Sequence, residues 1–116
     1  MNSKDHIVLE KLEKHCRSII GYCERCCNLQ DFEADPMCVE ATVFNLMQIG
    51  ELAKSGFSDE TKNNIPSIPW RQLYGMRNRL VHGYDGISMQ IVWDTVSEDI
   101  PILCEELRRV LSNAAL

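Results

Sequence analysis

Three side chains in one short segment could act together on a phosphate group: Arg77, His82 and Tyr84. An arginine keeps its charge and offers a fixed fork of donors to phosphate oxygens. A histidine ring exchanges a proton near neutral pH, and a tyrosine hydroxyl can donate, accept or be modified. Arg77 and Tyr84 would share a face if the helix continued, while His82 at a helix end could turn toward Arg77. Taken alone, these residues favour a simpler interpretation, a cationic helix C-terminus that interacts with the helix dipole.

The surroundings of this segment are basic although the whole chain is acidic. Residues 71–84 hold three arginines and no acidic residue, whereas the complete chain has a formal net charge of −5. Such a chain does not bind nucleic acid through bulk electrostatics, so any contact with RNA must be local. We expect Arg71 and Arg79 to extend a positive patch around Arg77. Glu51 lies in an otherwise apolar segment and is either a buried partner of Arg77 or one exposed edge of its helix.

The elements that must position these residues are all predicted to be helical. Apolar residues recur at steps of three or four, and no segment shows the pattern of a strand. Ser3 is the expected N-cap of the first helix, and residues 28–35 are expected to form a polar connector. The predicted helices span residues 4–27, 36–54, 58–64, 69–83 and 88–111, the last with a kink near residues 97–101 caused by Pro101 and a frayed tail after Leu111.

This pattern predicts an all-α protein with one domain, residues 1–116, built as an antiparallel four-helix bundle with one additional short helix. The helix 36–54 is apolar nearly all round, so we expect it at the centre of the bundle or in a dimer interface. Trp70 and Trp93 are expected to pack inside the protein rather than to stack on RNA. His6 and His15 are expected on the solvated surface of the first helix.

The chain contains six cysteines: Cys16, Cys23, Cys26, Cys27, Cys38 and Cys104. Only one CxxC pair is present, whereas a structural zinc site needs a second pair or two suitably spaced histidines. We therefore expect reduced thiols in the core or on the surface, and no bound metal or cofactor. The polar start of the chain, and the lack of an apolar stretch long enough for a membrane, predict a cytoplasmic protein without membrane contact.

The stretch Arg77-Asn78-Arg79-Leu80-Val81-His82-Gly83-Tyr84 resembles the Arg-x4-His-x-Tyr signature of HEPN-domain proteins. The likeness is closest to the HepT-like toxins, formerly the domain of unknown function 86 family. It extends to further landmarks in the same order and covers about residues 40 to 105: residues 45–53, 68–71, 75–78, 92–95 and 99–101.

The resemblance implies a homodimeric helical bundle and a metal-independent ribonuclease, with the motifs of two subunits meeting in a cleft. Carried over by position, it implies that Arg77 and His82 are the catalytic pair and that Asn78 is the polar residue next to the motif arginine. It also implies that Tyr84 receives AMP from a partner nucleotidyltransferase antitoxin of the MNT type. The chain would then be the toxin of a toxin–antitoxin pair.

Two other interpretations of the sequence stay open. The chain could be a non-catalytic HEPN module that only forms a complex with a nucleotidyltransferase, and the net charge of −5 mildly favours such a protein partner. It could also be a structural helical dimer whose motif is no more than a capped helix end.

Overall fold

The computed structural model describes residues 2–82 and 87–114, and every regular element in these ranges is helical. Four long segments and two short helices follow one another along the chain, and the last long segment consists of α6, η2 and α7 together. In order, they are α1 (Ser3–Tyr22), α2 (Leu29–Glu33), α3 (Pro36–Ser55), α4 (Asp59–Asn64), α5 (Trp70–Val81), α6 (Met89–Asp94), the π-helical turn η2 (Thr95–Asp99) and α7 (Ile100–Ala114).

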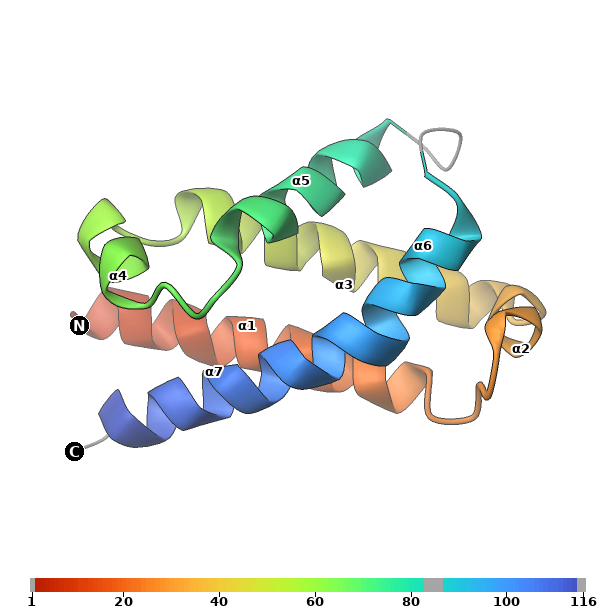
Figure 1. Cartoon of the computed structure of the whole chain (residues 1–116), viewed down its shortest axis with the longest axis horizontal. Helices are drawn as coiled ribbons and strands as arrows, with labels where there is room; N and C mark the ends of the chain where they lie inside the picture. The colour runs from red at the N-terminus through yellow and green to blue at the C-terminus, as the bar shows by residue number, and fades with distance from the viewer. Residues whose placement is uncertain (1, 83–86, 115–116) are drawn as a thin grey trace.

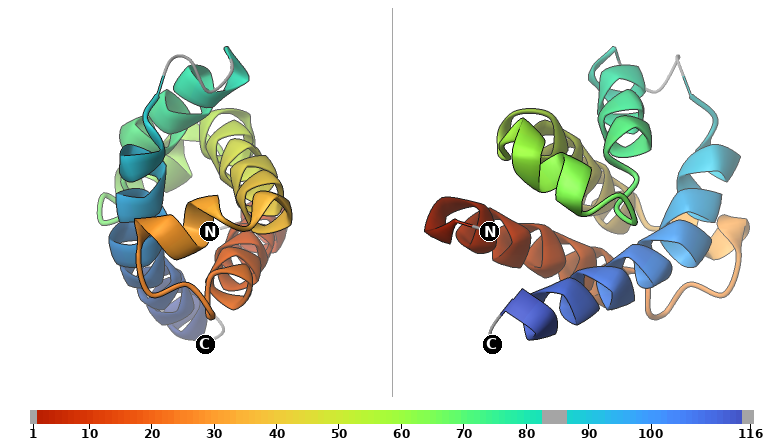
Figure 2. Two further views of the ribbon diagram at one scale, coloured as in Figure 1. Left: turned by 90° about the vertical axis from the view of Figure 1, so that its right-hand side faces the viewer. Right: turned by 60° about the vertical axis from the view of Figure 1, so that its left-hand side comes forward.

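The long helices run up and down in alternation. Helix α1 packs between α3 and α7, and α3 packs in turn against α5 (Figure 1). Helix α2 closes the end of the bundle that lies far from both termini, while α4 lies beside the start of α1 (Figure 2). The predicted all-α antiparallel bundle is therefore confirmed, with two short helices, α2 and α4, in place of the single one expected.

Helix α3 has the central position that its apolar sequence predicts. It contacts α1 on one side and α5 on the other, and its inward residues Val43, Leu46 and Ile49 are buried. They join a core with the inner faces of α1 and α7, where Leu9, Leu12, Ile19, Ile100 and Leu107 are almost completely inaccessible to solvent. Among the described residues, no helix is both long and apolar enough to cross a membrane.

The first helix differs from the prediction at both ends. Asn2, not Ser3, is its N-cap and accepts a hydrogen bond from the Asp5 amide at 2.7 Å. The helix ends at Tyr22 rather than near residue 27. The expected polar connector contains α2 instead, whose N-cap Asn28 accepts from the Asp31 amide at 2.8 Å.

Helix α2 is held by one buried ring. Phe32 is completely inaccessible to solvent, and its ring centroid lies 5.5 Å from that of Trp93. Trp70 likewise packs on Phe57, with ring centroids 4.8 Å apart. Both tryptophans are therefore packing residues, as predicted, and the contact made by Trp93 explains why a segment of polar sequence is helical.

The expected kink in the last helix is a π-helical turn. Pro101 has no N–H to donate, and the wider turn η2 immediately precedes α7. Thr95 and Ser97 donate their hydroxyl hydrogens to the carbonyls of Ile91 and Trp93, at 2.8 and 2.7 Å. Beyond this turn α7 stays helical to Ala114, so the prediction of a tail frayed after Leu111 is wrong over residues 112–114.

A buried carboxylate fastens α4 to the start of α1. Asp5 is only 2% exposed, and its Oδ2 accepts hydrogen bonds from the hydroxyls of Ser58, at 2.9 Å, and Thr61. The Thr61 hydrogen bond is the main reason why the pKa of Asp5 lies below its usual value, and Ser58 adds to it against the opposing effect of burial. The carboxylate therefore ties together elements more than fifty residues apart.

Candidate functional site

Three of the predicted site residues, Glu51, Arg77 and Asn78, lie at a close crossing of α3 and α5. Gly50 is buried at the crossing, and a Cβ added there would lie 2.7 Å from the Leu73 carbonyl oxygen and 3.1 Å from Cγ of Arg77. A glycine inside a helix costs about 1 kcal/mol relative to alanine, so its presence has a packing reason. Because Gly50 has no side chain, α5 can approach α3 closely at this point, and Arg77 lies against α3.

Two acceptors hold the guanidinium of Arg77. Its Nε forms an ion pair with Oε2 of Glu51 at a distance of 3.1 Å, and its Nη1 donates a hydrogen bond to Oδ1 of Asn78 at 3.1 Å. The Arg77 and Glu51 side chains keep 31% and 49% of their accessible surface. An ion pair this exposed adds at most about 1 kcal/mol of stability. Its consequence is geometric, since it orients an arginine that solvent and ligands can still reach.

The two interpretations of Glu51 combine in the structure. The predicted partnership with Arg77 is confirmed by the ion pair. Of the two alternatives for its location, the exposed edge of α3 is confirmed and burial is wrong. A carboxylate there can be displaced from Arg77 by an incoming phosphate without being stranded in the apolar core.

A second contact joins the same two helices beside Arg77. Nζ of Lys54 donates to the hydroxyl of Tyr74 at 2.6 Å and lies 4.4 Å from the centre of its ring. The hydrogen bond from Lys54 is the main cause that lowers the pKa of Tyr74, and Asn78 adds to it. The sequence alone did not predict this pair, because its two residues lie on different helices.

His82 is the C-cap of α5 and is exposed, as the sequence predicts for a helix end. On an ideal helix, the separation of five positions from Arg77 to His82 corresponds to about 140° around the axis. Tyr84 lies outside the described residues.

The other predicted arginines do not gather around Arg77. Both Arg71 and Arg79 are exposed on α5. Arg71 lies in the first turn and Arg79 in the last, about 12 Å apart along the axis. Residues two apart on a helix do not face each other, so Arg79 diverges from Arg77. The expected continuous positive patch does not form, because the three arginines are distributed along and around α5.

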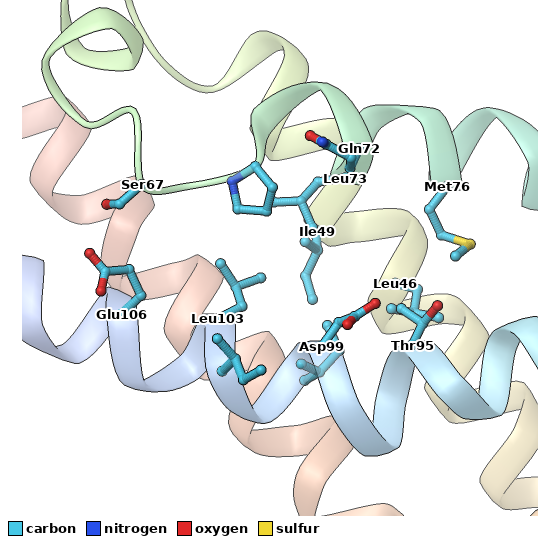
Figure 3. A pocket seen from close by; sticks show the side chains of 13 residues that line it. Leu46, Ile49, Ser67, Gln72, Leu73, Met76, Thr95, Asp99, Leu103 and Glu106 are labelled. Carbon is cyan, nitrogen blue, oxygen red and sulfur yellow. The ribbon is translucent and has the colours of Figure 1, made fainter.

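A separate groove of about 460 Å³ lies on another side of α5 (Figure 3). Its floor is apolar and includes Leu46, Ile49 and Leu103, while the carboxylates of Asp99 and Glu106 lie at its rim. None of the predicted site residues that the structure describes lines it. The carboxylate of Asp99 disfavours a phosphate there, and that of Glu106 already has Arg109 as its partner, so this groove is not the candidate site.

The cysteines are free thiols, as predicted. Sγ of Cys23 lies 3.9 Å from Sγ of Cys38, and burial raises the pKa of both Cys16 and Cys23. Within residues 2–82 and 87–114, no group of three potential ligands is arranged to hold a metal ion.

The prediction that His15 lies on the solvated surface of the first helix is wrong. Its Nδ1 shares a hydrogen bond of 2.8 Å with Asn45, between α1 and α3.

Comparison with known proteins shows the relatives of this chain. A family model described as "Ribonuclease HepT-like" matches residues 9–110. The chain belongs to this HepT-like family. It is 31% identical over 105 residues to a protein of Caldanaerobacter subterraneus subsp. tengcongensis named as a candidate RNase, covering 90% of this chain and 92% of that one. It is 39% identical over 83 residues to a Thermococcus cleftensis protein named as a candidate ribonuclease HepT, covering 69% and 74%. No solved structure matches the chain significantly.

The family match confirms the resemblance seen in the sequence. The HepT-like region includes all of α3 and α5 with the C-cap of α5, and therefore Glu51, Arg77 and His82. The residues matched by the family model thus include the close crossing of α3 and α5. The roles of the individual side chains stay predictions.

Proposed function

We propose that this HepT-like protein is a ribonuclease toxin in which Arg77 and His82 act together on the RNA backbone. The observation that supports it most is the crossing at Gly50, where Glu51 and Asn78 orient an arginine that remains accessible. An oriented guanidinium is suited to the charge that develops on phosphate oxygens during cleavage.

The reaction we propose uses a nucleophile of the substrate itself. The RNA 2′-oxygen attacks the adjacent phosphorus while the bond from phosphorus to the 5′-oxygen breaks. The products are a 2′,3′-cyclic phosphate and a free 5′-hydroxyl. His82 takes the proton from the 2′-hydroxyl or delivers one to the leaving 5′-oxygen. Arg77 stabilises the negative charge on the non-bridging oxygens. No metal-bound water is needed as a nucleophile in this scheme.

The same proposal includes a homodimer and a partner protein. Two copies would bring their α5 helices together, so that the Arg77 and His82 side chains of both subunits line one cleft. A nucleotidyltransferase antitoxin of the MNT type would transfer AMP to Tyr84, two residues after His82. The added negative charge and bulk would repel RNA phosphate and block the cleft.

A second candidate function follows from the acidic character of the chain. With a net charge of −5, and with Asp99 and Glu106 at the rim of an apolar groove, the protein is suited to bind a basic protein partner. In that case it would be a non-catalytic module that forms a complex with the nucleotidyltransferase.

RNA cleavage by the purified, unmodified chain distinguishes the two functions. The variants R77A and H82A should each lose about 10²- to 10⁴-fold in rate, the usual contribution of such groups. A matched control is R109A, which removes another exposed arginine paired with a glutamate, Glu106 on α7. Cleavage by R77A or H82A at the parental rate would refute the catalytic assignment. Toxicity on expression, lost in H82A, would argue against the non-catalytic module.

Two further measurements address the assembly and the modification. Light scattering after size exclusion should give twice the chain mass if the protein is a dimer. Mass spectrometry after co-expression with a nucleotidyltransferase should find one added AMP on the peptide that contains Tyr84, and none in the variant Y84F. An unmodified Tyr84 peptide would count against the antitoxin mechanism.

A further inference from the structure

We propose that Lys54 and Tyr74 form a nucleotide subsite beside Arg77, with the Tyr74 ring stacked on a base of the RNA and the Lys54 ammonium bound to a neighbouring phosphate. This inference rests on the proposed ribonuclease function and assigns substrate binding, not chemistry, to the pair.

Position is the first argument. Lys54 follows Glu51 by three residues in α3, and Tyr74 precedes Arg77 by three residues in α5. Because residues three apart are neighbours on a helix surface, the Lys54–Tyr74 contact lies about one turn, roughly 5 Å, from the Glu51–Arg77 contact. Consecutive phosphates of a single strand are spaced on a similar scale. One strand can therefore reach both contacts.

Charge is the second argument. Arg77 is paired with a carboxylate, whereas no carboxylate of the described residues forms an ion pair with Lys54. Lys62 adds another exposed ammonium, which donates to the backbone oxygen of Lys54 at 2.6 Å. A phosphate that binds Lys54 replaces only a neutral phenol as its partner. This end of the crossing is thus the more attractive place for the RNA backbone.

The chemistry of the ring is the third argument. Tyr74 is half-buried on α5, so its ring is held in place yet keeps part of its surface open. Rings fixed in this way beside a cation are the usual platforms for single-stranded nucleic acid, because every base has a face that stacks. The hydrogen bond from Lys54, which is the main cause of the lowered pKa of the Tyr74 phenol, holds an ammonium group beside the ring.

The test compares three variants with matched controls. Y74F keeps the ring, Y74L removes it, and K54Q removes the charge. The controls Y22L and K14Q change an exposed tyrosine and an exposed lysine on α1, away from the crossing. For each protein, kcat and KM are measured on a short oligoribonucleotide. Binding of an oligomer that carries a 2′-deoxyribose at the cleaved position is measured at several salt concentrations, and melting curves verify folding.

We expect Y74L to raise KM and the dissociation constant by about 5- to 150-fold with kcat nearly unchanged, and Y74F to bind like the parent. K54Q should weaken binding and reduce the slope of log K against log salt by about 0.7, the value for one phosphate on a single strand. Values for Y74L and K54Q within twofold of Y22L and K14Q would overturn the subsite. A fall in kcat alone would also overturn it, because the pair would then act by positioning Arg77.

Failure of the subsite and failure of the proposed function are distinguishable. If the parent cleaves RNA in a manner that depends on His82 while Y74L and K54Q behave like the controls, only the subsite is wrong. If the parent binds the oligomer without cleaving RNA, the binding arm decides the subsite by itself. If the parent neither binds nor cleaves RNA, both proposals are wrong.

Discussion

Replacing Gly50 by alanine perturbs a close approach between α3 and α5. The new Cβ would lie 2.7 Å from the carbonyl oxygen of Leu73 and 3.1 Å from Cγ of Arg77. Ordinary contacts of a Cβ begin near 3.4 Å. The helices must therefore separate by several tenths of an ångström or more, since a backbone oxygen cannot rotate away as a flexible side chain would.

The expected magnitude combines two opposing effects. Overpacking of a tight contact costs about 1–3 kcal/mol, and a rigid obstacle favours the upper end of that range. Alanine recovers up to about 1 kcal/mol over glycine inside a helix. The net loss in the free energy of unfolding is then about 2 kcal/mol, or a fall in Tm of roughly 5–10 °C for a chain of this size. Moving Arg77 by about 1 Å should in addition reduce RNA cleavage by about 10²-fold.

Thermal unfolding and RNA cleavage should be measured for G50A beside the control G75A. Gly75 lies on the same helix as Arg77, but a Cβ added there meets no atom within 4 Å. G75A should therefore gain up to about 1 kcal/mol and keep its activity. The cleavage assay belongs well below both melting temperatures, so that loss of fold does not imitate loss of geometry. If G50A were as stable and as active as G75A, the reasoning about the close crossing would be refuted.

Two further predictions concern structure away from the crossing. D5N should lower the free energy of unfolding by about 1.5–3 kcal/mol at neutral pH, because the hydroxyls of Ser58 and Thr61 lose a charged acceptor. The pKa of Asp5 is lower in the folded than in the unfolded protein, so this contribution is complete above about pH 5 and disappears as the pH falls through the folded pKa. Urea titrations should therefore show a smaller difference in the free energy of unfolding between the parent and D5N at pH 3 than at pH 7. An equal difference at both pH values would contradict the assignment. Iodoacetamide should label exposed Cys27 first and buried Cys16 only after unfolding, because burial raises the pKa of Cys16. Mass spectrometry of the labelled peptides measures this order, and equal labelling of the two cysteines in the native protein would contradict the burial of Cys16.

Periodicity predicted the long helices well because their buried faces are long and regular. It failed at α2, where helicity depends on one aromatic contact between Phe32 and Trp93. That contact joins residues 61 positions apart, and local spacing carries no information on it. The N-cap was wrong by one residue because Asn2 and Ser3 are both good caps and only geometry chooses between them.

The part of the site that lies on α5 was predictable from the sequence. Arg77, Asn78 and His82 follow each other on α5, and the partnership with Glu51 was inferred from a charge in an apolar segment. The Lys54–Tyr74 contact was missed because it depends on the register between α3 and α5. That register is determined by the contact at Gly50, which becomes visible only when both helices are placed.

The π-helical turn Thr95–Asp99 makes the last long helix sensitive to residue count. Before and through this turn the buried residues Val92, Val96 and Ile100 follow at steps of four, which suit its wider winding. Afterwards the buried positions return to mixed steps of three and four, the spacing of an ordinary α-helix. Deletion of one residue within the turn would rotate α7 by about 100° relative to α6. Length changes in this segment should therefore be far less tolerated than substitutions of its exposed side chains.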